Sequence, residues 1–355
     1  MERLATGSNL ERLATGSDLE RLATGLETSR RRQPAPGIDR LVTPLPFEGL
    51  DRVNAYALSD GDGGISLVDC GIFQEGRGAG PLKEALTASG AALKDVRRLV
   101  ITHPHPDHYG LASLLVEKTG CELWMHSDAR ADLDVYRDPG AAADTLSAAL
   151  AHHGVPASEL TELRAYEDWR PFISGVVEAS HWLEGEELLT DGARSWQVIH
   201  TPGHDRAHVC LWSQSDGLLI SGDTLLSSIT PHVDHRGELG ADPLGDFLAS
   251  LGRLEELDPS LVLPGHGRPF DAGAERARAI AAHHQRRLGS ILQVIRRRAC
   301  TAAEVAQEVF GPELLHYQHR LALGETIAHL EYLRLRSEAE MSEKDGIYRY
   351  AKAKR

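Results

Sequence analysis

Short apolar runs, each ending in a small or polar residue, divide the middle of this chain into predicted strands. Val96 to Thr102 has the pattern of a buried strand, and Ser195 to Ile199, Gly217 to Ile220 and Leu261 to Leu263 repeat it. Gly110 to Thr119, which follows the first of these strands, has the pattern of a helix. This arrangement predicts an α/β domain, in which functional side chains gather at the ends of strands.

Further elements surround these strands. Val53 to Leu58 and Gly64 to Val68 flank a turn rich in Gly and Asp, which predicts a hairpin. Leu82 to Ser89 predicts a short helix, and Cys121 to His126 predicts another strand. The helical stretches and the strands therefore alternate along most of the first half of the chain.

The last eighty residues have a different pattern. Glu275 to Arg298 predicts a long helix rich in Arg, and Thr301 to Phe310 predicts a second helix that begins with a capping box. Leu321 to Arg336 predicts a third helix, and Glu338 to Tyr350 predicts a small hairpin. The apolar residues of the third helix recur at helical spacing: Leu323, Ile327, Leu330 and Leu333. This stripe must be buried against another part of the protein.

The N-terminus is repetitive. A nine-residue unit, Glu2 to Leu10, is repeated almost unchanged directly after itself and begins a third time at Glu20. Each copy offers only Leu and Ala side chains for burial, so we expect a disordered or weakly helical tail. The predicted organisation is therefore a tail at 1–37, a main domain at 38–274 and a C-terminal domain at 275–355.

Ligand-type side chains follow the first predicted strand at high density. His103, His105, Asp107 and His108 stand within six residues, on the loop between strand and helix. Neutral imidazole and carboxylate are ligands that zinc, iron and manganese accept in proteins. Each of the three later strands is also followed by such a residue, next to or near a Gly that lets backbones approach closely: His204, Asp223 and His266.

The order of these motifs resembles the metallo-β-lactamase superfamily: Thr-His-x-His-x-Asp-His, then Thr-Pro-Gly-His, Gly-Asp-Thr and a final Gly-His. The resemblance covers about Arg40 to Phe270. It implies an α/β fold of the αββα type, in which two mixed sheets pack face to face with helices outside and metals at one edge. The implied ligands are His103, His105 and His204 for a first metal, Asp107, His108 and His266 for a second, and Asp223 as the bridge.

The resemblance implies two divalent metal ions, with Zn²⁺ preferred and Mn²⁺ or Fe²⁺ as alternatives. Two dications held close together need an anion between them, which a bridging carboxylate and a hydroxide supply. Metal binding lowers the pKa of water from about 15.7 to about 7, so this hydroxide is available at neutral pH. Asp107 and Asp223 are the expected catalytic carboxylates, and no Ser or Cys nucleophile is required.

Two details place the chain within this family. Asp69-Cys70-Gly71 resembles the Asp-x-Gly turn of the family, which is normally structural and close to the metals. True zinc β-lactamases usually lack an Asp at the position of Asp223. The match is therefore better to the broad hydrolase branch that includes glyoxalase II, lactonases, thioesterases and some nucleases.

The preferred hypothesis is hydrolysis of a small ester, thioester or lactone by attack of a metal-bridging hydroxide. The alternative is a metal-dependent phosphodiesterase or endoribonuclease whose C-terminal domain binds nucleic acid, because three helices and a hairpin resemble a winged-helix domain. A mono-iron oxygenase of the same fold would be expected to use fewer metal ligands. Tyr109, His232 and His235 are candidate substrate contacts.

Charge bears on the choice between these hypotheses. From Glu275 onward the chain has 15 Lys and Arg against 10 Asp and Glu, a net charge of +5 within a chain of −14, which leaves −19 for residues 1–274. A strongly acidic main domain would repel a polyanion. The basic residues of the tail are spread along it, so a domain that packs, dimerises or closes the pocket is favoured over one that binds nucleic acid.

Residues 128–190 form a long insertion with helical stretches at 141–152 and 158–166. Two interpretations remain open: a wall of the substrate pocket, as is frequent in this family, or an outer helical layer packed on the sheet.

Composition predicts a cytoplasmic enzyme that acts on a small molecule. The chain has 355 residues, 41% of them hydrophobic, which is enough for a sizeable core. No apolar run approaches the ~18 residues of a membrane span, and residues 1–37 lack the apolar segment of a secretory signal. The four cysteines are scattered and are expected to be buried free thiols. Whether the chain forms a homodimer is left open.

Overall fold

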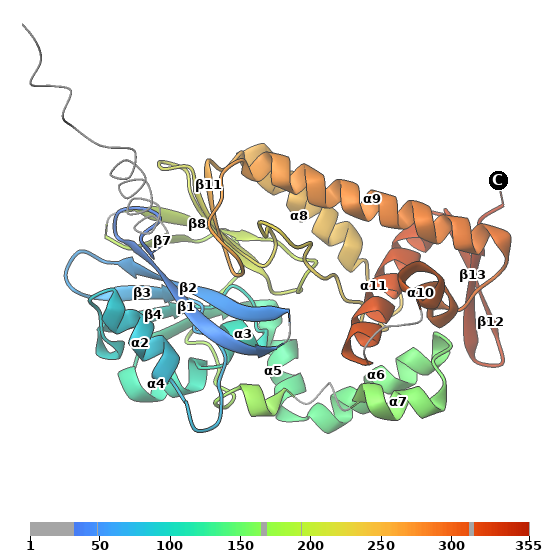
Figure 1. The fold of residues 1–355 in the computed structure, drawn as a ribbon, viewed down its shortest axis with the longest axis horizontal. Coiled ribbons are helices and arrows are strands. Elements are labelled where there is room, and N and C mark those ends of the chain that lie inside the picture. Colours follow the sequence, from blue (N-terminus) through green and yellow to red (C-terminus); the bar gives the residue numbers. More distant parts are fainter. Residues whose placement is uncertain (1–31, 48, 165–168, 193, 312–315, 355) are drawn as a thin grey trace, which may run out of the picture.

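The computed structural model describes residues 32–354, except 48, 165–168, 193 and 312–315. The predicted disorder of the repeats at 1–31 lies outside the described residues. Two mixed sheets pack face to face, and a mainly helical region lies at one end of this sandwich (Figure 1). Within the described residues, every helix is too short or too polar to cross a membrane.

The first sheet has six strands in sequential order. Its first three strands are antiparallel, and β3 to β6 are parallel, since helices or long loops connect them. The strands are β1 (Ile38–Phe47), β2 (Leu50–Ser59), β3 (Ile65–Val68), β4 (Val96–Val100), β5 (Glu122–His126) and β6 (His181–Leu183). The predicted hairpin is thus confirmed as the β2–β3 pair.

The second sheet has five strands in the order β11-β10-β9-β8-β7. All neighbours are antiparallel except β10 and β11, which are parallel and are connected through helix α8. The strands are β7 (Leu188–Thr190), β8 (Ser195–His200), β9 (Val209–Ser213), β10 (Leu218–Gly222) and β11 (Leu261–Pro264).

An apolar layer joins the two sheets, and helices cover their outer faces. Leu58 and Val100 of the first sheet are buried in the same cluster as Trp196 and Ile220 of the second. Helices α2 (Gly80–Ala88), α4 (Ala112–Thr119) and α5 (Arg130–Arg137) contribute to the core outside the first sheet. Helices α8 (Pro243–Leu257) and α9 (Gly273–Arg297) cover the second. The αββα prediction is confirmed.

The C-terminal region consists of α10 (Ala302–Phe310), α11 (His316–Leu335) and a hairpin of β12 (Ala339–Lys344) and β13 (Ile347–Lys352). The capping box is present, because the Glu304 backbone N–H donates to Thr301 Oγ1 and the Thr301 N–H donates to the Glu304 carboxylate. Helix α11 begins earlier than the predicted Leu321. Its first residues are mostly polar, so they did not contribute to the apolar pattern on which the prediction was based. Its predicted apolar stripe is fully buried against α8, α9 and α10.

The insertion at residues 128–190 is neither a pocket wall nor an outer layer on the sheet along its whole length. Helix α5, which the sequence pattern did not predict, packs with the first sheet through Leu133 and Tyr136. Helix α6 (Pro139–His152) instead contacts β13 and α7 (Ala157–Arg164), and α7 contacts α11. The insertion therefore joins the sandwich to the C-terminal region.

Three buried imidazoles lie where the C-terminal elements pack together. Burial lowers the pKa of His153 and His329 to about 4 and that of His284 to about 3. These side chains are therefore neutral in the folded protein, whereas an unfolded imidazole has a pKa of about 6.5. Between pH 6.5 and 4 the unfolded chain binds more protons, so the free energy of unfolding falls as the pH is lowered.

We expect His153→Phe to reduce this pH dependence, because the variant keeps an aromatic ring and removes one titrating group. The shift of His153 corresponds to about 3 kcal/mol of stability lost between pH 6.5 and 4 at about 1.4 kcal/mol per pKa unit. Urea unfolding at several pH values measures it. His152→Phe, at an exposed neighbour, is the control. Equal slopes for His153→Phe and the wild type would contradict the assignment.

Truncation after Asp271 should prevent the main domain from folding stably, because it uncovers the apolar face of α8. Phe247, Leu251 and Leu254 are buried there against α9, and each buried side chain of this kind contributes about 1.5–3 kcal/mol. Soluble yield and far-UV circular dichroism on heating measure the effect. Cooperative melting of the truncated chain near the wild-type temperature would show that the C-terminal region is dispensable for folding.

Candidate metal centre

The four predicted strand ends meet at one edge of the sandwich. One of them, the end of β4, belongs to the first sheet, and those of β8, β10 and β11 belong to the second. The loop after β4 leads into the short helix α3 (Pro106–Tyr109). These loops bring together all seven predicted ligands: His103, His105, Asp107 and His108 after β4, His204 after β8, Asp223 after β10 and His266 after β11.

A first group consists of three imidazoles. His105 Nδ1 lies 3.0 Å from His103 Nε2 and 3.1 Å from His204 Nε2. Two nitrogens that bind one tetrahedral zinc ion at about 2.0–2.1 Å lie about 3.3 Å apart. Burial lowers the pKa of all three imidazoles, and neighbouring imidazoles add to the effect, so their lone pairs are available to a metal at neutral pH.

A second group lies beside the first and combines carboxylates with imidazoles. His266 Nε2 is 3.2 Å from Asp107 Oδ2 and 3.2 Å from Asp223 Oδ2. His108 Nε2 lies 3.5 Å from Asp223 Oδ1. Asp223 also lies 3.9 Å from His204 Nε2 of the first group, through its Oδ2 atom. The Asp223 carboxylate therefore faces both groups.

The charges of this second group suit a cation. Burial opposes the charges of Asp107 and Asp223, but His108 and His266 outweigh it and lower the pKa of both carboxyls. In return, the two carboxylates raise the pKa of His266 to about 10 despite its burial. His108 Nε2 and Asp223 Oδ1 are buried without a hydrogen-bond partner among the described residues. A metal ion would displace the protons and satisfy these atoms.

Gly265 makes this close approach possible. A Cβ atom at this position would lie 2.2 Å from Asp223 Oδ1 and 2.8 Å from His108 Cε1. Any other residue would therefore push the carboxylate of Asp223 out of the site.

Asp69 orients one imidazole from behind. His108 Nδ1 lies 2.7 Å from Asp69 Oδ2, which leaves His108 Nε2 to face the site. Thr102 holds the same carboxylate in place, since its backbone N–H donates to Oδ1 and its hydroxyl donates to Oδ2. Asp69 adopts a left-handed φ of 61°, which Asp tolerates better than most residues. The predicted structural role of this turn agrees with the geometry.

Backbone carbonyls orient two more imidazoles. His266 Nδ1 donates to the carbonyl of Arg52 at 2.8 Å, and His204 Nδ1 donates to the carbonyl of His232 at 2.7 Å. A ring nitrogen that donates in this way fixes the tautomer, so that the other nitrogen is a free metal ligand.

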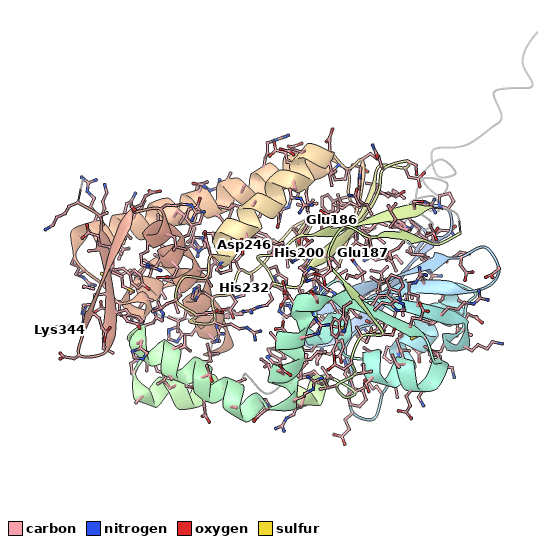
Figure 2. The ribbon with its side chains drawn as sticks, turned by 180° about the vertical axis from the view of Figure 1, so that it is seen from behind. Glu186, Glu187, His200, His232, Asp246 and Lys344 are labelled. Atoms are coloured by element: carbon pink, nitrogen blue, oxygen red, sulfur yellow. The ribbon has the colours of Figure 1, made fainter. Side chains whose placement is uncertain are left out.

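The three predicted substrate contacts differ in their surroundings. Tyr109 is wholly buried, and its hydroxyl donates to the carbonyl of Val177 and accepts from the Val177 N–H. His235 is also buried, and its Nδ1 accepts from the backbone of Gly237. Neither side chain is brought to the ligand groups. His232 is part-exposed and lies between the sandwich and the C-terminal helices (Figure 2).

Sequence patterns missed several residues that support the site. His208 Nε2 accepts from the backbone N–H of Asp223, and its Nδ1 contacts the hydroxyls of Thr201 and Thr224. Its position four residues after His204 was the available signal. In β2, Asn54 donates to the carbonyls of Pro264 and Gly267, which fastens the His266 loop to the first sheet. A polar residue inside the apolar run Val53 to Leu58 marked this position.

Two other groups of ligand-type residues lie outside this centre. His126 and His200 stack with their rings 3.9 Å apart and 13° from parallel, and with Asp128 they form a second, separate group of possible ligands. His284, Glu325 and His329 gather between α9 and α11. The Glu325 carboxylate already faces Arg287 at 3.4 Å and His232 at 3.7 Å. The positive charge of Arg287 offsets the negative charge of this carboxylate, so the group offers a metal ion less negative charge than the centre with Asp107 and Asp223.

Comparisons with known proteins agree with this geometry. The family described as the metallo-beta-lactamase superfamily matches residues 49–266, and the metallo-beta-lactamase-like C-terminal domain matches residues 288–353. The probable metallo-hydrolase YqjP of Bacillus subtilis is 27% identical over 320 residues, which cover 82% of this chain and 90% of that protein.

Two crystal structures share the fold over most of the chain. A metallo-beta-lactamase family protein from Thermus thermophilus is 31% identical with a TM-score of 0.77, over 90% of this chain and 100% of that one. A beta-lactamase domain protein from Burkholderia ambifaria is 34% identical with a TM-score of 0.78, over 90% and 93%. With its buried groups of His and Asp ligands, the chain belongs to the metallo-beta-lactamase superfamily and is a metallo-hydrolase.

Proposed function

We propose that this chain hydrolyses a small ester, thioester or lactone with two metal ions. The observation that carries the proposal is the position of the Asp223 carboxylate, which faces a group of three imidazoles on one side and a group with Asp107, His108 and His266 on the other. Two adjoining donor sets that share a carboxylate suit a pair of dications.

Zn²⁺ is the ion that we propose, with Mn²⁺ or Fe²⁺ as alternatives, because imidazole and carboxylate are the donors and no thiolate takes part. Bound there, the ions would supply hydroxide at neutral pH and polarise the carbonyl of the substrate. Asp107 then would have two tasks: as a ligand its carboxylate would offset the charge of the second ion, and, held in its charged form beside His266 at 3.2 Å, it would orient the nucleophile.

The chain offers no cysteine nucleophile at this edge. All four cysteines lie in described parts of the chain and are buried free thiols. Burial raises the pKa of Cys70 and Cys210, which are the cysteines near the ligand loops. Cys70 donates to the carbonyl of His108 at 3.1 Å. A buried thiol with a raised pKa is a poor nucleophile, which favours direct attack by hydroxide.

The charge of the main domain supports a small substrate over a nucleic acid. Residues 1–274 carry a net charge of −19, and several basic side chains of the C-terminal region form ion pairs with acidic neighbours, such as Arg298 with Glu304 and Glu308. Tight binding of RNA at physiological salt would instead favour the phosphodiesterase alternative.

Asp223→Ala should abolish hydrolysis and release metal while the sheets stay folded, because Asp223 lies after the end of β10. We expect the variant to retain at most one ion per chain by elemental analysis and to lose at least ~10³-fold in kcat/KM, the scale of one lost transition-state interaction. Melting temperatures of the metal-free proteins are the control. Full activity with both ions retained would refute the bridging role.

Hydrolysis in ¹⁸O-labelled water tests the mechanism itself. In a single turnover on an ester, thioester or lactone, the label should appear directly in the product acid, since attack by a carboxylate of the protein would transfer an unlabelled oxygen instead. Chelator should abolish the turnover, and Zn²⁺ or Mn²⁺ should restore it. Trapping of a covalent acyl-enzyme would contradict the mechanism, and cleavage of a phosphodiester alone would contradict the substrate class.

Asp69→Asn should weaken metal binding without unfolding the chain. Asn tolerates the left-handed φ and keeps the size of the side chain, but it is neutral and cannot accept with two anionic oxygens from His108 and Thr102. Loss of such an orienting partner lowers metal affinity about 10–100-fold. Zn²⁺ competition with a chromophoric chelator measures it, and an affinity equal to that of the wild type would contradict this role.

A further inference from the structure

The imidazole of His204 depends on a segment without regular structure. Its Nδ1 donates to the carbonyl of His232 at 2.7 Å, and this bond turns its Nε2 toward His105. No helix or strand includes residues 226–242. In the described part of the chain, residues 230–236 make no backbone–backbone hydrogen bond. The position of this carbonyl is therefore fixed by side chains.

Helix α11 supplies the strongest of these contacts. Arg320 Nη1 and Nη2 donate to the two carboxylate oxygens of Asp234 at 3.0 and 2.9 Å, and the Arg320 side chain is only 8% exposed. Paired contacts of this kind fix orientation as well as distance. Asp234 stands two residues after the carbonyl that orients His204. Val233, between them, is wholly buried in the same cluster as Leu323 and Ile327 of α11.

Gly324 shows that α11 is shaped for this contact. A Cβ atom at this helical position would lie 1.8 Å from Asp234 Oδ1 and 2.8 Å from Arg320 Nη1. Gly in a helix interior costs about 1 kcal/mol relative to Ala, and here it admits the Asp234 carboxylate to the helix surface. At the next residue, the Glu325 carboxylate faces His232 Nδ1 at 3.7 Å. His232, Val233 and Asp234 are therefore all held against α11. Figure 2 shows His232 between the sandwich and the C-terminal helices.

We propose that Arg320 is a positioning residue for the metal centre: through Asp234 it holds the His232 carbonyl that orients the metal ligand His204. The C-terminal region is then part of the metal centre, although none of its side chains is among the ligands. The inference rests on metal binding by His204 and is independent of which substrate is hydrolysed.

The chain contains a matched control for a purely structural role. Arg336, at the other end of α11, donates to Asp242 at 2.8 Å and so also joins α11 to the end of the same segment. Asp242 lies ten residues from His232, at the N-cap of α8. Loss of Arg336 therefore removes an ion pair between the same two elements without freeing the His232 carbonyl.

The first experiment compares Arg320→Ala with Arg336→Ala in the full chain. Each protein is stripped of metal and titrated with Zn²⁺ in buffers of defined free Zn²⁺ concentration, and the melting temperature of the metal-free form is recorded. We expect Arg320→Ala to weaken the binding of one Zn²⁺ ion about 10–100-fold, the effect typical of a lost orienting partner. Arg336→Ala should leave both Zn²⁺ affinities unchanged.

Arg320→Lys should restore part of the affinity, because a single ammonium can still pair with Asp234 but cannot bind both of its oxygens. Asp234→Asn should weaken Zn²⁺ binding like Arg320→Ala, and the double variant should be no worse than either single variant, since the two residues act as one unit. Additive losses would show that they act separately.

Gly324→Ala separates metal affinity from stability. Alanine favours the helix, yet its Cβ displaces Asp234, so we expect weaker Zn²⁺ binding without a comparable loss of melting temperature. Gly289→Ala on α9, where a Cβ meets no atom within 4 Å, is the control. Unchanged Zn²⁺ affinity in both Arg320→Ala and Gly324→Ala would overturn the proposal. A wild-type chain that binds no Zn²⁺ would overturn the metal centre itself.

Discussion

The crowding of buried carboxylates and imidazoles at one edge of the sandwich is the constraint on which the rest of the structure depends. Charges removed from water are costly unless other charges or hydrogen bonds compensate them. Asp107 and Asp223 lie side by side with His108 and His266, and each pair shifts the pKa of the other toward the charged form. Such a group is stable only around positive charge, which bound metal ions would supply.

The fold keeps this group together by fixing its members from several sides. Strand ends from both sheets deliver the ligands, and the two sheets are joined at that edge by Asn54 and Tyr56, which donate to the carbonyl of Pro264. Asp69 and backbone carbonyls then set the direction of individual rings. Small residues are needed as well as the ligands, because a side chain at Gly265 would displace the Asp223 carboxylate.

The C-terminal region takes part in this arrangement and is more than an appendage. Helices α10 and α11 pack against α8 and α9, which cover the outer face of the second sheet. Helix α11 also holds the segment that carries His232. In the proposed function this region supports the metal centre, where the bound ions and their water would perform the chemistry and the protein would orient them.

The sequence by itself determined the strands that lead into the ligand loops, the order of the motifs and the seven ligand-type residues at the strand ends, because apolar periodicity and ligand spacing are local properties. It did not predict β1, β6, β7 or β9. It also predicted the capping box of α10 and the apolar stripe of α11. Only the tertiary structure decided which residues orient the ligands. His208, Asn54 and Arg320 act across distances of up to 213 residues in the chain, and a contact of this kind leaves no periodic pattern. Tyr109 and His235 were predicted as substrate contacts because they stand close in sequence to the ligands and to Asp223. Tertiary packing instead buries both side chains, which the local sequence does not reveal.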